Sequence, residues 1–152
     1  MSDRDVDAHL IRELAQALDV IATEHRCPPG EVLFRQGQAA DGVFVVRRGK
    51  VRLSAWSHDG DERLPYRTAG PGYVLGLPAL FSGEPYSLAA EVLEESVLGR
   101  VDREAALDLV RRHLDLCLQA ADLLAREVRN LREWQAAHMI KANSVSCSPA
   151  QQ

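Results

Sequence analysis

The chain has few cysteines, and those it has are far apart. Cys27, Cys117 and Cys147 are scattered over 152 residues, and no two of them form a Cys-X-X-Cys pair. An odd, dispersed set of this kind favours free thiols in a reducing compartment over a disulfide framework or a zinc cluster. We therefore expect a cytoplasmic protein with no metal and no cofactor.

The sequence also lacks a long hydrophobic run and an excess of positive charge. Its first residues, MSDRDVDAHL, have neither the basic flank nor the apolar stretch of a secretory signal, and no later run is long enough to cross a bilayer. The formal net charge of −4 at pH 7 opposes contact with nucleic acid or an anionic membrane. We expect no direct nucleic-acid binding and no membrane association.

Residue patterns typical of enzymes are missing as well. The five histidines do not form the closely spaced set that binds a catalytic metal in jelly-roll enzymes. The sequence has no glycine-rich phosphate loop and no paired nucleophile and base. We expect that the protein is not an enzyme.

Hydrophobic periodicity divides the chain into a helical start, a β-rich middle and a helical end. Residues 5–25 carry apolar side chains every three or four positions, which predicts an amphipathic helix that ends before Pro28. Between residues 31 and 101, short apolar runs alternate with turn residues such as Gly37, Gly49 and Gly60. These runs predict many short strands, and the absence of long helices between them favours an antiparallel jelly roll.

The end of the chain is predicted to form two helices. A short one begins after Asp102, buries Ala105, Ala106, Leu109 and Val110, and ends at a bend near His113. The second, over about residues 114–139, is roughly 39 Å long at 1.5 Å per residue. Residues at alternating spacings of four and three along it form a coiled-coil seam: Cys117, Ala121, Leu124, Val128, Leu131, Gln135 and His138. We expect a homodimer through this seam; the alternative is a helix that packs on its own β-roll.

Together these elements predict a mainly β fold with flanking helices. The expected class is a double-stranded β-helix, or jelly-roll, barrel followed by a long C-terminal dimerisation helix. Residues 1–139 are assigned to one domain, with the β-roll at about 28–101. Residues 140–152 are rich in Ser, Ala, Asn and Gln, and we expect them to form a disordered tail.

Two segments resemble the cyclic-nucleotide-binding (effector) domain of Crp/Fnr-type regulators. Residues 29–53 are similar to the opening strands of that family: Pro29-Gly30, Gly37, Phe44-Val45-Val46 and Gly49. Residues 70–90 are similar to its phosphate-binding cassette: Gly70-Pro71-Gly72, Gly76, Ser82-Gly83-Glu84-Pro85 and Ser87-Leu88-Ala89-Ala90. The resemblance covers roughly residues 10–139. It implies a sensor domain without the DNA-binding domain that follows it in the family.

At the ligand site implied by this resemblance, the chain departs from the family pattern. In the family, a glutamate after the cassette glycine holds the ribose hydroxyl, and an arginine neutralises the cyclic phosphate. Here Leu77 follows Gly76, and Tyr86 stands at the arginine position. Charge-assisted hydrogen bonds contribute about 1.5–3 kcal/mol each, so the loss of two weakens binding by roughly 10²–10⁴-fold. We expect poor binding of cAMP and cGMP.

The resemblance also implies which residues surround the ligand. The candidate set is Gly76, Leu77, Pro78, Ala79, Tyr86, Ser87, Leu88, Leu131 and Arg132, with Leu75 and Leu80 at the border of the same pocket. At the positions of Leu131 and Arg132 the family's nucleotide binders offer small hydroxyl side chains to the base, and neither residue is an equivalent donor. Such a pocket is more apolar than a nucleotide site.

Three functions remain open from the sequence. The first is a ligand-sensing regulatory domain of the transcriptional-regulator type, in which an unidentified small-molecule effector shifts the seam between Leu124 and Leu131. The second is a ligand-free dimerisation or interaction scaffold, which a self-filled pocket favours. The third is a haem-based gas sensor with His113, Cys117 or His138 as iron ligands, although each of these residues has a simpler structural role.

Overall fold

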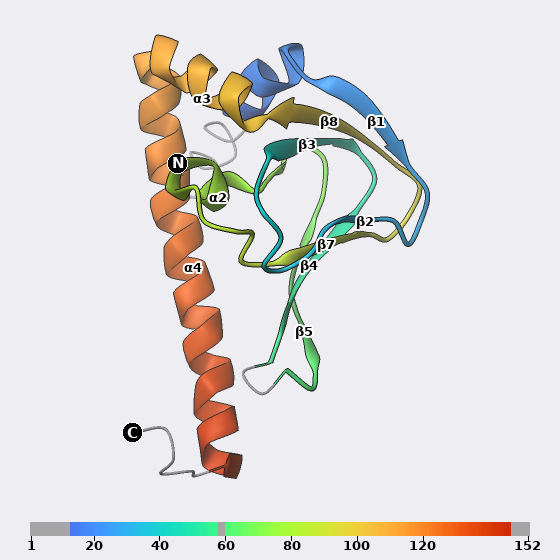
Figure 1. Ribbon diagram of the computed structural model, residues 1–152, viewed down its shortest axis with the longest axis vertical. Helices are drawn as coiled ribbons and strands as arrows, with labels where there is room; N and C mark the ends of the chain where they lie inside the picture. Colours follow the sequence, from blue (N-terminus) through green and yellow to red (C-terminus); the bar gives the residue numbers. More distant parts are fainter. Residues whose placement is uncertain (1–12, 58–59, 147–152) are drawn as a thin grey trace, which may run out of the picture.

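A computed structural model describes residues 13–57 and 60–146, with side chains placed up to residue 138. The strands lie on one side of the molecule, and a single long helix runs along the other side (Figure 1). Within the described ranges, no helix combines the length and the apolar character needed to span a membrane.

The strands form two antiparallel sheets. The first has the order β1-β8-β3-β6, from β1 (Thr23–Cys27), β8 (Ser96–Asp102), β3 (Gly42–Arg48) and β6 (Val74–Leu75). The second has the order β2-β7-β4-β5, from β2 (Val32–Phe34), β7 (Ala89–Val92), β4 (Val51–Trp56) and β5 (Arg63–Ala69). The predicted antiparallel roll is confirmed. The sheets are not joined into a closed barrel, because no strand ladder connects one described sheet to the other.

Strand β3 is buried on both faces and separates two hydrophobic cores. Val43 and Val45 belong to the core that the helices share with the first sheet, which we call the helix-side core. Phe44 and Val46 point the opposite way, into the space between the sheets, which we call the roll interior. Side chains alternate along a strand, so a strand buried on both faces is a continuous apolar run in the sequence.

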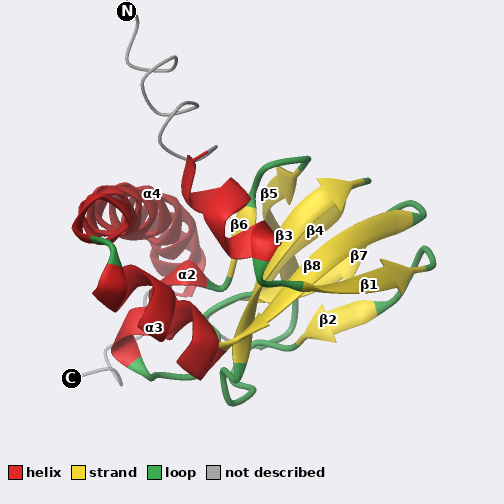
Figure 2. Cartoon of the chain, turned by 90° about the horizontal axis from the view of Figure 1, so that it is seen from above, coloured by secondary structure: helices red, strands yellow, loops and turns green. Residues whose placement is uncertain are grey.

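The helices gather on one side of the sheets, as seen in Figure 2. They comprise residues 13–20, α2 (Leu77–Ser82), α3 (Arg103–Arg112) and α4 (Leu114–Ser146). Leu14 and Leu18 are fully buried in the helix-side core, where Leu80, Val110 and Ala120 meet them. A fully buried leucine contributes about 2 kcal/mol, so this core holds the helices on the roll.

The predicted first helix is too long. It ends at residue 20, and residues 23–27 form β1, which pairs with β8 along its whole length. Apolar spacing near residue 21 continues the helical pattern, but pairing with a strand some 70 residues away is not visible locally. The roll therefore begins at Thr23 and not near residue 28. Residues 5–12 of the predicted helix lie outside the described residues.

The two C-terminal helices also differ from expectation in detail. Their junction at His113 is confirmed, but in α3 the buried face contains Leu107, while Ala105 is exposed and Leu109 half-buried. Helix α4 was predicted to end near residue 139 and continues to Ser146, because the first strong helix breaker beyond it is Pro149. The rest of the predicted disordered tail, residues 147–152, lies outside the described part.

Candidate ligand-binding site

A cavity lies where β6 and α2 meet α4. Its volume is about 40 Å³. Residues from both sheets, α2 and α4 line it: Phe34, Leu53, Tyr73, Val74, Leu75, Gly76, Leu77, Pro78, Ala79, Tyr86, Ser87, Leu88, Glu127 and Leu131. A water molecule needs about 10–15 Å³ of such space, so this cavity has room for a few waters but not for a nucleotide.

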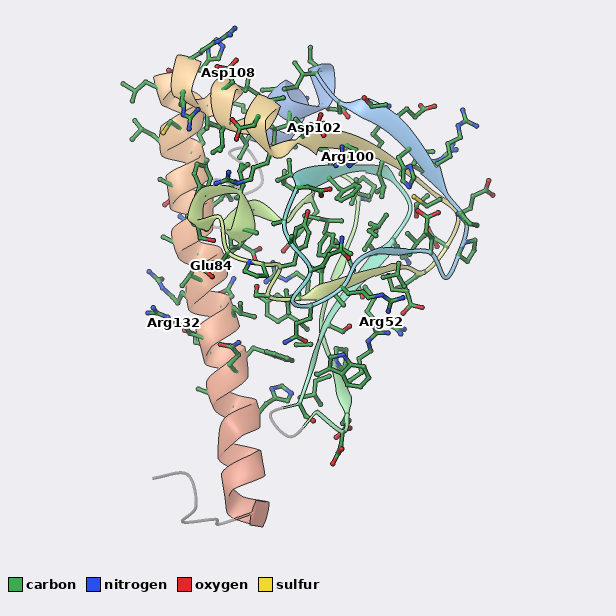
Figure 3. The ribbon with its side chains drawn as sticks, viewed as in Figure 1. Arg52, Glu84, Arg100, Asp102, Asp108 and Arg132 are labelled. Carbon is green, nitrogen blue, oxygen red and sulfur yellow. The ribbon has the colours of Figure 1, made fainter. Side chains whose placement is uncertain are left out.

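The structure brings eight of the nine candidate residues together around this cavity. The exception is Arg132, which is exposed and points away from the β-roll (Figure 3). Successive helical residues lie about 100° apart, so when Leu131 faces the cavity its neighbour faces outward. Leu75 lines the cavity as expected, whereas Leu80 packs in the helix-side core.

Gly76 sets the backbone shape of the cassette. Its φ of 88° is left-handed, and it begins the short helix α2, with Pro78 in the first turn. A Cβ atom at this position would lie 3.0 Å from Cε1 of Tyr86 and 3.3 Å from the Gly42 carbonyl oxygen. Only glycine fits this backbone conformation without strain and without displacing the tyrosine ring.

Tyr86 fills the place where the family has its phosphate-binding arginine. Its side chain is only 3% exposed, and its hydroxyl donates a hydrogen bond of 2.6 Å to the Gly42 carbonyl oxygen. The ring stacks on Phe34 with centroids 3.9 Å apart. Burial raises the pKa of Tyr86, so the phenol stays neutral. The cassette thus presents an uncharged, internally bonded ring instead of a cation.

Leu77 occupies the position of the family's glutamate, and it is part of the fold. It is 3% exposed and packs in the helix-side core while also lining the cavity. Its side chain offers no acceptor for a ribose hydroxyl. The cavity wall is therefore apolar at the two positions where a nucleotide would be held most strongly.

The polar part of the wall contains one carboxylate. Among the described residues that line the cavity, Glu127 alone carries a charge. It accepts a hydrogen bond of 2.6 Å from the Tyr73 hydroxyl and lies 3.5 Å from the Arg67 guanidinium. Burial and the adjacent carboxylate raise the pKa of Tyr73, so it donates as a neutral phenol. Arg67 offsets part of the charge of Glu127, and the described lining residues include no cation that would attract an anionic ligand.

Sequence reasoning did not find Glu127 and Tyr73. One signal was available for the first: Glu127 lies four residues before Leu131, and residues at this spacing share one helix face. No sequence pattern pairs Tyr73 with a residue that follows it by 54 positions.

A sequence model of the cyclic nucleotide-binding domain matches residues 24–113. The chain belongs to the cyclic nucleotide-binding domain family. The cyclic AMP receptor protein of Thermus thermophilus is 35% identical over 106 residues, which are 70% of this chain and 47% of that protein. The anaerobic regulatory protein of Bacillus subtilis is 31% identical over 97 residues, or 62% and 40% of the two chains. This domain spans about half the length of these relatives, and the predicted resemblance to Crp/Fnr-type regulators is confirmed.

Solved structures show the same fold. The Thermus thermophilus catabolite activator protein superposes with a TM-score of 0.72 at 27% identity, covering 82% of this chain and 58% of that one. The sensor domain of the regulator DNR from Pseudomonas aeruginosa superposes with a TM-score of 0.61, covering 88% and 93%. At 20% identity the latter likeness shows the fold alone. The predicted cyclic-nucleotide-binding-like roll with a long helix is confirmed.

Helix α4 of this cyclic nucleotide-binding domain contacts its own roll with one face. Ala120 and Leu123 are buried, and Trp134 meets the edge of Tyr66 with ring centroids 5.4 Å apart. The predicted seam lies beside this face: Ala121 and Gln135 are exposed, while Cys117, Leu124, Val128, Leu131 and His138 are half-buried. The nearby Leu114 and Leu118 are 70% and 62% exposed. The helix thus packs on the roll and still presents an uncovered apolar stripe.

The structure does not gather the three residues considered as iron ligands. His113 ends α3 at the surface, and Cys117 packs against the helix-side core. His138 lies beside Trp134, about 32 Å from Cys117 along the helix at 1.5 Å per residue. None of them is among the residues that line the cavity.

Proposed function

We propose that this domain is the ligand-sensing module of a Crp/Fnr-type transcriptional regulator and does not bind cAMP or cGMP with high affinity. The observation that carries the proposal is Tyr86, whose buried ring and internal hydrogen bond replace the phosphate-binding cation. The names of the relatives, a cyclic AMP receptor and an anaerobic regulatory protein among them, support a regulatory role over a catalytic one.

Charge and size both oppose a cyclic nucleotide. Leu77 removes the ribose acceptor, Tyr86 removes the phosphate cation, and Glu127 adds a negative charge to the wall. The two lost charge-assisted bonds alone weaken binding by roughly 10²–10⁴-fold. A nucleotide would also have to displace the Tyr86 ring from Phe34. The effector that suits this wall is small, mainly apolar and not anionic.

Calorimetry with cAMP and cGMP tests this proposal. We expect no binding at micromolar concentration for the native domain, and a gain of at least about tenfold for the double variant Leu77→Glu with Tyr86→Arg, because each restored contact is charge-assisted. Arg52→Gln is the control, since Arg52 is exposed on β4, is not among the residues that line the cavity, and its change restores neither contact. A dissociation constant of 1 μM or tighter for the native domain contradicts the proposal.

We also propose that the domain dimerises through α4. The support is the apolar stripe beside its packing face, which includes Leu118 and Leu124. Leu131 lies both in the predicted seam and in the cavity wall, so a ligand there acts directly on the helix. Leu118→Asp with Leu124→Asp should give monomers in analytical ultracentrifugation, while Glu133→Gln, at an exposed position on the side of α4 opposite Leu124, should leave the dimer intact. A native monomer at high concentration contradicts the proposal.

A second function, a ligand-free scaffold, is favoured by one observation. The cavity of about 40 Å³ is what remains after Tyr86 and Leu77 have filled the cassette. A thermal-shift screen of nucleotides, haem and small metabolites separates the two functions. A sensor gains stability with at least one compound, as any ligand that binds only the folded state must produce. A scaffold shows no shift while its dimer persists.

A further inference from the structure

Three potential metal ligands converge at the turn between β1 and β2. The imidazole of His25, the thiol of Cys27 and the carboxylate of Glu31 each offer one ligand atom, and these atoms all lie within 4.8 Å of one another. His25 Nε2 is 2.7 Å from Glu31 Oε2. In a tetrahedral zinc site the ligand atoms are roughly 3.3–3.7 Å apart, so shifts of about an ångström in the side chains suffice to admit an ion.

The backbone holds all three residues in place. His25 and Cys27 are two apart on β1, so their side chains leave the same face of the strand, and both pair with β8. Pro28, Pro29 and Gly30, the last with a φ of 91°, then turn the chain back. The Val92 N–H donates a 2.8 Å bond to the Glu31 carbonyl, which fixes the residue that follows the turn. Because the backbone already holds the three residues close together, little conformational entropy is lost when an ion binds.

The thiol of the cluster is buried, whereas the other two ligand side chains are partly open to solvent. Cys27 is 2% exposed, and burial together with Glu31 raises the pKa of its thiol to about 12. The metal-free thiol is therefore protonated, and a bound ion has to displace that proton, as thiolate ligation requires. The side chains of His25 and Glu31 are 45% and 32% exposed, which leaves a route from solvent.

We propose that His25, Cys27 and Glu31 bind one divalent ion of the zinc class, with a fourth coordination position open to water. A nitrogen, a sulfur and an oxygen ligand select zinc-like ions over magnesium and calcium, which prefer oxygen alone. The site lies on β1, at the opposite edge of the first sheet from β6 and the cavity. The ion would clamp the β1–β2 turn to the strand. This proposed metal site does not depend on the function proposed for the cassette.

The expectation of a metal-free protein came from the scattered cysteines and from the lack of a histidine cluster, and neither criterion covers a mixed set of one histidine, one cysteine and one glutamate. The ligand pattern here is His-X-Cys-X₃-Glu, with a single histidine. The proline-proline-glycine turn makes the glutamate a neighbour of the strand, and that proximity appears only in three dimensions.

Titration with Co²⁺ tests the site, because a thiolate ligand gives a charge-transfer absorption that nitrogen and oxygen ligands do not. The protein used carries Cys117→Ser and Cys147→Ser, so that Cys27 is its only thiol. We expect a saturable band at one Co²⁺ per chain that Zn²⁺ displaces and Mg²⁺ does not. Adding Cys27→Ser should abolish the band.

His25→Gln and Glu31→Gln, both at half-exposed positions that tolerate substitution, should each weaken Zn²⁺ binding by at least about 100-fold, the upper end of what loss of a partner behind a metal ligand costs. Glu24→Gln is the matched control, since this neighbouring carboxylate lies on the opposite face of β1 and should leave affinity unchanged. Thermal unfolding without metal checks that each variant folds. The absence of a saturable band, or affinity that survives Cys27→Ser, overturns the proposal.

Discussion

The opening strands, residues 29–53, and the cassette, residues 70–90, follow the family pattern in different ways. In the opening strands both the turn glycines and the apolar side chains match, and Gly37 and Gly49 have φ values of 85° and 108°. In the cassette the glycine matches and keeps its left-handed φ of 88°, but the ligand-binding side chains are replaced by Leu77 and Tyr86. The two regions share backbone shape and differ in chemistry.

This difference separates two roles of the family pattern, namely the packing of the cores and the binding of a ligand. In the opening strands, the side chains that match the pattern form the cores: Phe44 in the roll interior and Val45 in the helix-side core. In the cassette, the substituted side chains have joined these cores, Tyr86 in the roll interior and Leu77 in the helix-side core. A ligand site can therefore become a packing site without any change in the path of the chain. If the cassette side chains now serve to pack the cores, substitutions among them should lower the stability of the domain.

The largest effect is expected for Tyr86→Ala. It removes a ring stacked on Phe34 and a buried hydrogen bond to Gly42, and should lower the free energy of unfolding by about 3–5 kcal/mol, as for other buried aromatic truncations. Urea denaturation measures this loss. Ser87→Ala, at the exposed neighbouring position, should change stability by less than about 0.5 kcal/mol. A loss below 1 kcal/mol for Tyr86→Ala would contradict the packing role of this ring in the cassette.

A smaller loss is expected for Gly76→Ala. The left-handed backbone costs a side chain about 1–2 kcal/mol, and the new Cβ also contacts the Tyr86 ring, so about 2–3 kcal/mol is expected. Gly72→Ala isolates the backbone cost, because its φ is 91° and nothing lies within 4 Å. Gly70→Ala has neither problem and should be neutral or stabilising by up to about 1 kcal/mol. Equal losses of unfolding free energy for Gly76→Ala and Gly72→Ala would show that the Tyr86 ring moves aside for the new Cβ at no energetic cost.

Local sequence patterns predicted most helices and strands. The boundaries and contacts that they did not predict depend on residues far apart in the sequence. The short apolar runs between residues 31 and 101 predicted strands such as β4, because the spacing of apolar side chains is a local property. The end of the first helix was misplaced because β1 depends on β8, which lies far along the chain. The resemblance to Crp/Fnr-type regulators located the cassette, and eight of the nine residues that it implied line the cavity. That Tyr86 bonds to Gly42, or that Tyr73 meets Glu127, depends on how the roll and α4 pack, which no local pattern encodes.

The smallest effect concerns the polar wall, where the cassette region meets α4. Tyr73→Phe removes the hydrogen bond to Glu127 and should cost about 1 kcal/mol at neutral pH, below the usual 1.5–3 kcal/mol for a charged acceptor because Glu127 is partly solvated and keeps Arg67. The folded state raises the pKa of Tyr73, so this stabilisation is complete below the unfolded value of 10.0 and is lost as the pH rises above it.

The difference between the native domain and Tyr73→Phe should therefore shrink between pH 7 and about pH 11, measured by urea denaturation at both values. The two proteins share all other titrating groups, so the contribution of those groups to the pH dependence of stability cancels in the comparison. A difference that grows with pH would show that the Tyr73 phenol is ionised in the folded protein. In that case the wall would carry a negative charge on Tyr73 as well as on Glu127, and it would repel an anionic ligand more strongly than Glu127 beside a neutral phenol does.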